Sequence, residues 1–156
     1  MTNPTDTTAG LGELTITRVF DAPREMVFGA MLDPEQLTHF WGPTGTRTPI
    51  ECIVIEPWPG GRFETTMVPE GAPIDDGFVM KAVFVEVVEP ERVVFKQDLP
   101  TGEMTTASTY TDLGDGRTRV VIHQTNLPPE YSTDEAQAGF NSSLDKFAAY
   151  LATRAR

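Results

Sequence analysis

The side chains most able to do chemistry in this sequence are few and widely spaced. Its two histidines, His39 and His123, stand far apart, and Cys52 is the single cysteine. Neither histidine has a second histidine two or four residues away or a cysteine pair nearby, as a metal site would need. The sequence also lacks glycine-rich phosphate-binding loops and a nucleophile-elbow motif. We therefore expect no bound metal and no cofactor, and we interpret Cys52 as a small apolar strand residue.

Proton transfer is the chemistry that remains, and three side chains are weak candidates for it. Glu86 follows Phe84 on the side of a predicted strand that should face inward, where a carboxyl group is suited to acid or base work. Tyr110, like Ser143, is able to orient a ligand by hydrogen bonding. His123 is a possible base, although strand alternation favours an outward position for it. Glu86 lies near a strand end, so a solvated position is the favoured interpretation for this residue and a buried carboxyl group is the alternative.

A larger set of apolar side chains lies on faces that should point into the interior. Several neighbouring interior positions carry small or polar residues in place of the larger aliphatic residues that fill a core. These positions are Thr65, Ala82, Thr106, Ser108 and Ser143. The pattern indicates a mostly apolar ligand cavity between a sheet and a helix. The residues expected to line it are Trp41, Phe63, Met67, Phe78, Met80, Phe84, Tyr110, Phe140, Ser143, Leu144 and Phe147.

The strongest signal for a positioning element is a long helix over Ser132–Arg154. Ser132 and Glu135 have the spacing of a capping box at its start. Its apolar residues recur every three or four positions and so share one face. They are Ala136, Phe140, Leu144, Phe147 and Leu151. Such a helix needs an apolar surface of similar length to cover this stripe.

Upstream of Pro128 the sequence is typical of strands separated by turns. Proline and aspartate favour helix starts near Pro23 and Pro34, so two short helices are expected between the first strand and the rest. The strands are bounded by glycine and proline turns. Seven are predicted, at residues 14–20, 50–55, 62–67, 77–85, 93–98, 104–112 and 118–126. A twisted antiparallel sheet of this size should curl around the long helix, which gives an α+β fold.

Length and charge limit the possible partners. The chain has 156 residues of 39% hydrophobic composition, which suits one domain with one core. Its formal net charge of −11 makes nucleic acid and anionic membrane surfaces unexpected partners. Residues 1–12 lack a secretion-signal pattern, and we expect a flexible tail there, followed by a single domain at 13–156. A cytoplasmic location is the corresponding expectation.

Several motifs together resemble the family named after the activator of the heat-shock-protein ATPase, a branch of the START-like, birch-pollen-allergen-like (SRPBCC) superfamily. The motifs are Phe20-Asp21-Ala22-Pro23 with Val27-Phe28, Asp33-Pro34-Glu35, Phe40-Trp41-Gly42-Pro43, Pro59-Gly60-Gly61-Arg62-Phe63, Pro90-Glu91-Arg92-Val93-Val94-Phe95 and the helix from Gly139 to Phe147. The resemblance covers residues 14 to about 152. It departs from the family at Phe28 and Phe140, where tryptophan is common. It implies a helix-grip fold, in which the curved seven-stranded sheet wraps around the long C-terminal helix.

The resemblance also implies a function. It implies a protein that binds a small hydrophobic, lipid-like or aromatic molecule in the cavity under the long helix. The alternative is a cofactor-free enzyme similar to the polyketide cyclases and related hydrolases, which would use the proton-transfer candidates. Co-chaperone-like partner binding, as for the activator that named the family, is the third expectation. The protein is expected to be a monomer or a homodimer, because Val79, Val83 and Val85 should make the outer face of the sheet apolar.

Overall fold

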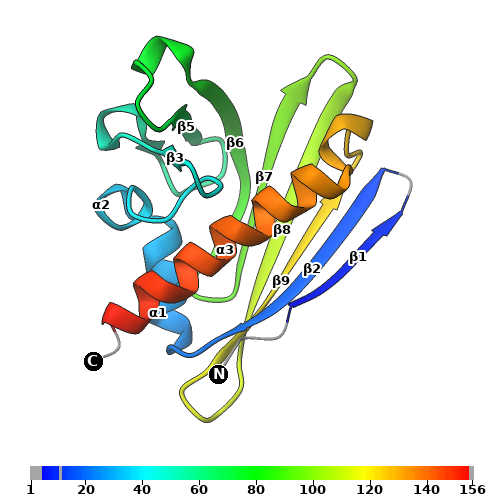
Figure 1. The fold of residues 1–156 in the computed structure, drawn as a ribbon. Helices are drawn as coiled ribbons and strands as arrows, with labels where there is room; N and C mark the ends of the chain where they lie inside the picture. Colours follow the sequence, from blue (N-terminus) through cyan, green and yellow to red (C-terminus); the bar gives the residue numbers. More distant parts are fainter. Residues whose placement is uncertain (1–4, 11, 155–156) are drawn as a thin grey trace.

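The computed structural model describes residues 5–10 and 12–154, and a long helix lies across a curved antiparallel sheet (Figure 1). Within these residues nine strands form one sheet in the order β1-β2-β9-β8-β7-β6-β5-β3, and β4 pairs with β5 beside that path. The strands are β1 Thr5–Gly10, β2 Glu13–Phe20, β3 Thr46–Arg47, β4 Val54–Ile55, β5 Arg62–Pro69, β6 Phe78–Val88, β7 Arg92–Leu99, β8 Gly102–Asp112 and β9 Thr118–Thr125. The helices are α1 Arg24–Met31, α2 Pro34–Leu37 and α3 Asp134–Arg154, with 3₁₀ turns η1 Ile50–Cys52, η2 Ile74–Asp76 and η3 Pro129–Tyr131.

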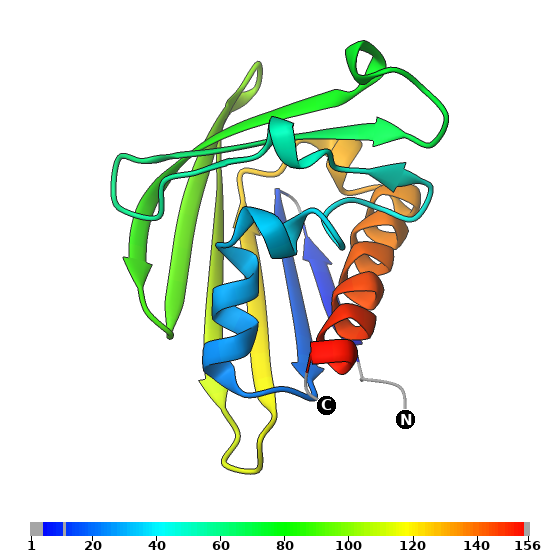
Figure 2. The same cartoon turned by 90° about the vertical axis from the view of Figure 1, so that its left-hand side faces the viewer.

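The sheet has the curvature of a helix-grip fold. Figure 2 shows that β5 and β6 turn away from the direction of β2 and β9, so the sheet forms a bent wall around α3. Neighbouring strands are antiparallel, and side chains alternate between the two faces as the pleat requires. In β2, for example, Leu14, Ile16 and Phe20 are buried on the concave face. The expected α+β architecture is therefore confirmed.

The C-terminal half of α3 closes one end of the core. The ring of Phe147 lies 4.2 Å from that of Phe40 and 4.9 Å from that of Phe20, measured between ring centroids. Burying an apolar side chain of this size stabilises the fold by about 1.5–3 kcal/mol. Between Asp134 and Ser143, all of them described residues, no side chain is fully buried. The helix is therefore anchored mainly by its C-terminal half.

The start of α3 differs from the predicted capping box. The Thr133 hydroxyl accepts the backbone N–H of Ala136 at 3.1 Å, so Thr133 is the capping residue. The Ser132 hydroxyl instead donates to the Pro129 carbonyl at 2.9 Å, because Ser132 ends the preceding turn η3. The cap prediction was therefore one residue too early. Neither α3 nor another described helix is long and apolar enough to cross a membrane.

The two short helices expected after the first strand are confirmed. The chain enters α1 at Pro23, whose fixed φ suits a helix start. At the start of α2, the Asp33 carboxylate accepts the backbone N–H of Glu35 at 3.1 Å. Phe28 of α1 packs edge-to-face against Tyr110 of β8, with ring centroids 5.2 Å apart. The helix pair thus closes the concave face next to the C-terminal end of α3.

The edges of the sheet differ most from the sequence expectation. Residues 5–10 form β1, which pairs with β2 from Thr5 opposite Arg18 to Gly10 opposite Glu13. A flexible tail is therefore wrong for this segment, whereas residues 1–4 and 11 of the predicted tail lie outside the described residues. Backbone pairing along an open edge needs no apolar pattern, so the sequence gives little sign of it. The short strand β3 was also not expected.

The strand predicted at 50–55 is mostly a turn. Residues Ile50–Cys52 form η1, and only Val54 and Ile55 pair with β5. Pro49 precedes the turn with an extended backbone. The segment was predicted as a strand because it is rich in β-branched residues, which favour strands. The segment therefore adds only two residues to the edge of the sheet.

Candidate ligand-binding site

The concave face of the sheet carries polar side chains at positions where a closed core would be apolar. Thr106, Ser108, Gln97 and Gln124 point inward from the central strands and are each at most 9% exposed. The Gln124 side-chain amide donates to the Thr106 hydroxyl at 3.2 Å, which links β9 to β8. No side-chain hydrogen bond of Gln97 is found among the described residues, and its amide atoms are not among the fully buried polar atoms that lack a partner. The amide therefore keeps accessible surface and can bond to a ligand.

Exposed fractions show where this face remains open. Phe20 and Leu151, at the closed end of the core, are each 1% exposed. Phe95, Ser108 and Ile122 keep 8%, 8% and 9%, although each lies within a strand that has paired neighbours on both sides. The side chains of α3 from Asp134 to Ser143, Phe140 among them, are also not fully buried. We call this set of partly accessible interior side chains the crevice and define it by Phe95, Gln97, Thr106, Ser108, Ile122 and Phe140.

The loop after α2 is fixed between the sheet and α3. The indole N–H of Trp41 donates to the Thr65 hydroxyl at 3.0 Å. The Ser143 hydroxyl accepts the backbone N–H of Gly42 at 3.2 Å and donates to the carbonyl of Phe40 at 3.2 Å. The proton of Ser143 is therefore already committed to the loop. The structure gives Ser143 a tethering role, which differs from the ligand-orienting role expected from the sequence.

A buried arginine joins the sheet to the helix. Arg18 is 3% exposed and points inward from β2, where it donates to the Asp145 carboxylate and, at 3.3 Å, to the Asn141 carbonyl. Its guanidinium carbon lies 5.8 Å from the ring centre of Phe20. Within the described chain, Arg18 Nε and Asn141 Oδ1 are buried without a hydrogen-bond partner. We did not predict a role for Arg18, although its charge at an inward position two residues from Ile16 was an available signal.

Glu86 lies outside the crevice because β6 contains a bulge. The pairing of β6 with β7 passes from Phe84 directly to Glu86, so Val85 is an extra residue. The extra residue reverses the alternation, and Glu86 faces outward. There its carboxylate accepts a hydrogen bond from Arg92 Nε at 2.7 Å, and both side chains are more than one third exposed. The solvated position favoured for Glu86 is therefore the observed one, whereas the inward side that strand alternation alone indicates is wrong.

The other two proton-transfer candidates lie on opposite faces of the sheet. His123 is on the outer face, as alternation favoured, with Nε2 3.1 Å from Glu13 Oε1. Tyr110 is 3% exposed on the inner face, and this burial raises the pKa of its hydroxyl. A tyrosine held protonated can donate a hydrogen bond but is a poor base. In the described part of the chain, no group of three or more His, Cys, Asp or Glu side chains could hold a metal ion.

Comparison with known proteins assigns the family. Residues 21–152 match the family model of Activator of Hsp90 ATPase homolog 1-like protein, AHSA1. The chain belongs to this family. No match was found among curated proteins.

Solved structures share the AHSA1 fold of this chain. Protein CV1439 from Chromobacterium violaceum is 24% identical with a TM-score of 0.78, and the alignment covers 89% of this chain and 96% of that one. Protein Ms6760 from Mycobacterium smegmatis is 25% identical with a TM-score of 0.73, covering 97% and 99%. The AHSA1 (SPO3351) protein from Silicibacter pomeroyi is 22% identical with a TM-score of 0.75, covering 91% and 99%. These similarities support the helix-grip fold.

Most residues predicted to line the cavity of this AHSA1 domain do belong to the interior. The buried ones are Phe63, Met80, Phe84, Tyr110, Leu144 and Phe147, and the half-buried ones are Trp41, Met67, Phe140 and Ser143. Phe78 is the exception, because it is 53% exposed. As the first residue of β6, Phe78 lies at a strand end where no element covers it. Binding of a ligand by these residues stays a prediction.

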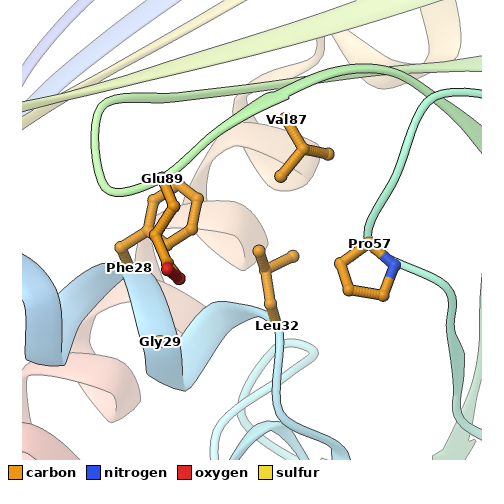
Figure 3. A pocket seen from close by; sticks show the side chains of 6 residues that line it. All are labelled: Phe28, Gly29, Leu32, Pro57, Val87 and Glu89. Carbon is orange, nitrogen blue, oxygen red and sulfur yellow. The ribbon is translucent and has the colours of Figure 1, made fainter.

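A pocket of about 500 Å³ lies away from the crevice. It is formed by α1, the loop between β4 and β5, and the end of β6 with the turn that follows (Figure 3). Its lining residues are Phe28, Gly29, Leu32, Pro57, Val87 and Glu89. None of them is among the predicted ligand-binding residues. No local sequence pattern indicates this pocket, because the bulge that brings Val87 to the inner face was not expected.

Proposed function

We propose that this AHSA1-family protein binds a small, mostly apolar molecule with a few hydrogen-bonding groups in the crevice. The observation that carries the proposal is the accessible surface that Phe95, Ser108 and Ile122 retain in the middle of a paired sheet. A closed core would bury these side chains fully, as it buries Phe20. The half-buried ring of Phe140 adds an apolar wall from α3.

The polar groups of the crevice favour an amphipathic ligand over a plain hydrocarbon. The Gln97 amide offers two donors and one acceptor oxygen, and Ser108 offers a hydroxyl. A ligand that carries a carbonyl or hydroxyl group would satisfy them, whereas a hydrocarbon would leave them without partners at a cost of about 1–3 kcal/mol each. Apolar sites with a few placed polar groups are typical of small-molecule pockets.

Two of the three residues on which the enzyme alternative depends lie outside the crevice. Glu86 and His123 lie on the outer face of the sheet, so neither can transfer a proton within the crevice. Tyr110 remains inside, but its raised pKa suits hydrogen-bond donation rather than base catalysis. Of the two functions, binding therefore has more support than a cyclase or hydrolase reaction. The co-chaperone expectation rests on the family name alone.

The test combines native mass spectrometry with two matched variants. Native spectra and solvent extraction of the purified protein should reveal a bound molecule of a few hundred daltons, a size typical of small-molecule ligands. Titration with N-phenyl-1-naphthylamine, a neutral apolar fluorophore, then measures binding directly. Ser108→Leu should fill the crevice and weaken dye binding at least tenfold, while Ala107→Leu on the outer face of the same strand should leave it unchanged. Equal dye binding by a folded Ser108→Leu variant would contradict the proposed location.

A further inference from the structure

The pocket beside α1 is a half-open hollow large enough to admit a small molecule. Its volume of about 500 Å³ lies within the range of known ligand pockets, roughly 300–1,000 Å³. In Figure 3 the side chains of Leu32, Val87 and Pro57 converge on one space from three segments of the chain. Phe28 forms the inner wall and is itself held by Tyr110. These contacts provide an apolar surface that is fixed before any ligand arrives.

The pocket carries one charged side chain, and its charge is negative. Glu89 is the single charged residue among the six that line it. No ion pair of Glu89 is found in the described part of the chain, and Figure 3 shows its carboxylate directed toward the turn of α1 that contains Gly29. The one arginine of α1, Arg24, is in the first turn and does not line the pocket.

The C-terminal end of α1 is a second source of negative potential at this pocket. Gly29 and Leu32 belong to its last turn and C-cap, where backbone carbonyls carry the negative end of the helix dipole. This last turn has no basic residue to compensate the dipole. Because Gly29 has no side chain, it presents its backbone directly to the pocket. A chain with a net charge of −11 strengthens the preference for cations further.

We propose that this pocket binds an organic cation, an ammonium group attached to an aromatic or branched apolar body. The body occupies the space between Phe28, Leu32 and Val87. The ammonium group lies between the Glu89 carboxylate and the carbonyl end of α1, where both the side chain and the helix favour positive charge. The site is separate from the crevice, since the two share no residue, and it does not depend on the function proposed there.

Three probes of nearly equal shape and different charge test the proposal. They are 2-phenylethylamine, 2-phenylethanol and 3-phenylpropionate, each titrated into ¹⁵N-labelled protein while amide chemical shifts are recorded. The amine should shift the amides of Gly29, Leu32 and Glu89, and it should bind most tightly. The alcohol should bind two- to fivefold more weakly, as expected for the loss of one partly exposed charge pair. The acid should bind more weakly still.

Variants then separate charge from shape. Glu89→Gln should lower the affinity for the amine toward that for the alcohol, with the carbonyl end of α1 left in place, and it should leave the affinity for the alcohol unchanged. Glu25→Gln is the matched control, because it removes the same charge from α1 outside the pocket. Gly29→Leu should abolish binding of both probes by filling the pocket. A side chain fits there without distortion, since a Cβ at Gly29 meets no atom within 4 Å, and leucine favours a helix more than glycine does.

Each outcome decides the proposal. Shifts around Gly29 with a preference for the amine over the alcohol that is lost in Glu89→Gln, but not in Glu25→Gln, would support it. Equal affinity for the amine and the acid would overturn it, as would equal effects of the two glutamine variants. Shifts confined to Ser108 and Ile122 would also overturn it, because they would place the probe in the crevice instead.

Discussion

Single residues on the concave face decide how the sheet and α3 are held together. Arg18 is the clearest case, since a buried guanidinium is costly unless it is paired. Its partner Asp145 lies on the exposed side of α3, so the pair spans from the interior to solvent. A carboxylate near the surface keeps part of its hydration, which reduces the cost of forming the pair. Arg18 therefore acts as a polar link between β2 and the middle of α3.

Removal of the carboxylate should destabilise the fold through the arginine it leaves behind. Asp145→Ala is expected to lower the free energy of unfolding by about 1–3 kcal/mol, because Arg18 loses a charge-assisted hydrogen bond while it stays buried. Urea unfolding monitored by circular dichroism measures the change. The double variant Arg18→Met, Asp145→Ala should recover much of this loss, because no unpaired charge remains. An Asp145→Ala protein as stable as the wild type would show that the link contributes nothing.

Tyr110 should make stability depend on pH in the alkaline range. Burial raises the pKa of its hydroxyl in the folded state, whereas in the unfolded chain the pKa is about 10. Below that value both states hold the proton and stability is unaffected. At higher pH the unfolded state releases the proton first, so the free energy of unfolding falls. Tyr110→Phe should match the wild type at pH 8 in urea unfolding and be the more stable protein near pH 11. Parallel decline of both proteins would contradict this assignment.

At the scale of elements, the loop after α2 connects three parts of the molecule. Trp41 joins it to β5, and Ser143 joins it to α3 through two backbone groups. The loop also follows directly on Phe40, which stacks on Phe147. The loop therefore contacts α3 just before the well-buried half of the helix.

Loss of the Ser143 hydroxyl should loosen this loop. Ser143→Ala leaves the N–H of Gly42 and the carbonyl of Phe40 without their partner, at an expected cost of about 1–3 kcal/mol. Amide hydrogen exchange at Gly42 should accelerate together with the drop in unfolding free energy. Thr153→Ala is a suitable control, since that hydroxyl lies at an exposed site and, among the described residues, donates to the carbonyl of Tyr150 alone. If the two variants behave alike, Ser143 has no special role in holding the loop.

The elements predicted from the sequence are those with long, regular patterns. The apolar stripe of α3, the proline-marked helices and the alternation in β2, β8 and β9 all specified faces correctly, because each depends on a period that local residues express. Glu86 was misplaced because a bulge changes the alternation without any glycine or proline to mark it. The cap at Thr133 was missed because serine and threonine stand next to each other and both suit the position.

Features of the candidate site were harder to predict than the fold. The inward positions of Thr106 and Ser108 follow from strand alternation, and the structure confirms their burial. The commitment of Ser143 to the loop depends on contacts across about a hundred residues of chain, which no local pattern encodes. The pocket at Gly29 is formed by three segments that are distant in the sequence, so no local pattern predicts it either.

At the scale of the whole molecule, interior packing differs between the two ends of α3. The rings of Phe20, Phe40 and Phe147 pack together where α3 ends. Toward its start, from Asp134 to Ser143, no side chain of the helix is fully buried. Local stability follows packing, so it should vary along the helix.

Hydrogen exchange along α3 should report this asymmetry. Amides beyond Leu144 should be the most protected of the helix, and those between Ala138 and Asn141 should exchange faster, because the latter segment has no fully buried side chain. Mass-spectrometric or NMR exchange measurements resolve the two halves. Added N-phenyl-1-naphthylamine should slow exchange in the first half only. Uniform protection along α3 would contradict the picture of a helix anchored at one end.

The bulge in β6 has a consequence for how the length of this chain can vary. The residues on either side of Val85 keep consecutive partners in β7, since Phe84 pairs with Phe95 and Glu86 with Val94. Deletion of Val85 would therefore shorten the chain by one residue without changing a single strand pair. It would remove the local bend and the added twist that a bulge gives to a strand. The fold is thus expected to tolerate this one-residue deletion, and the part of β6 that lines the pocket beside α1 should become flatter. The shape of this pocket can therefore change through the length of β6, without replacement of any residue that lines it.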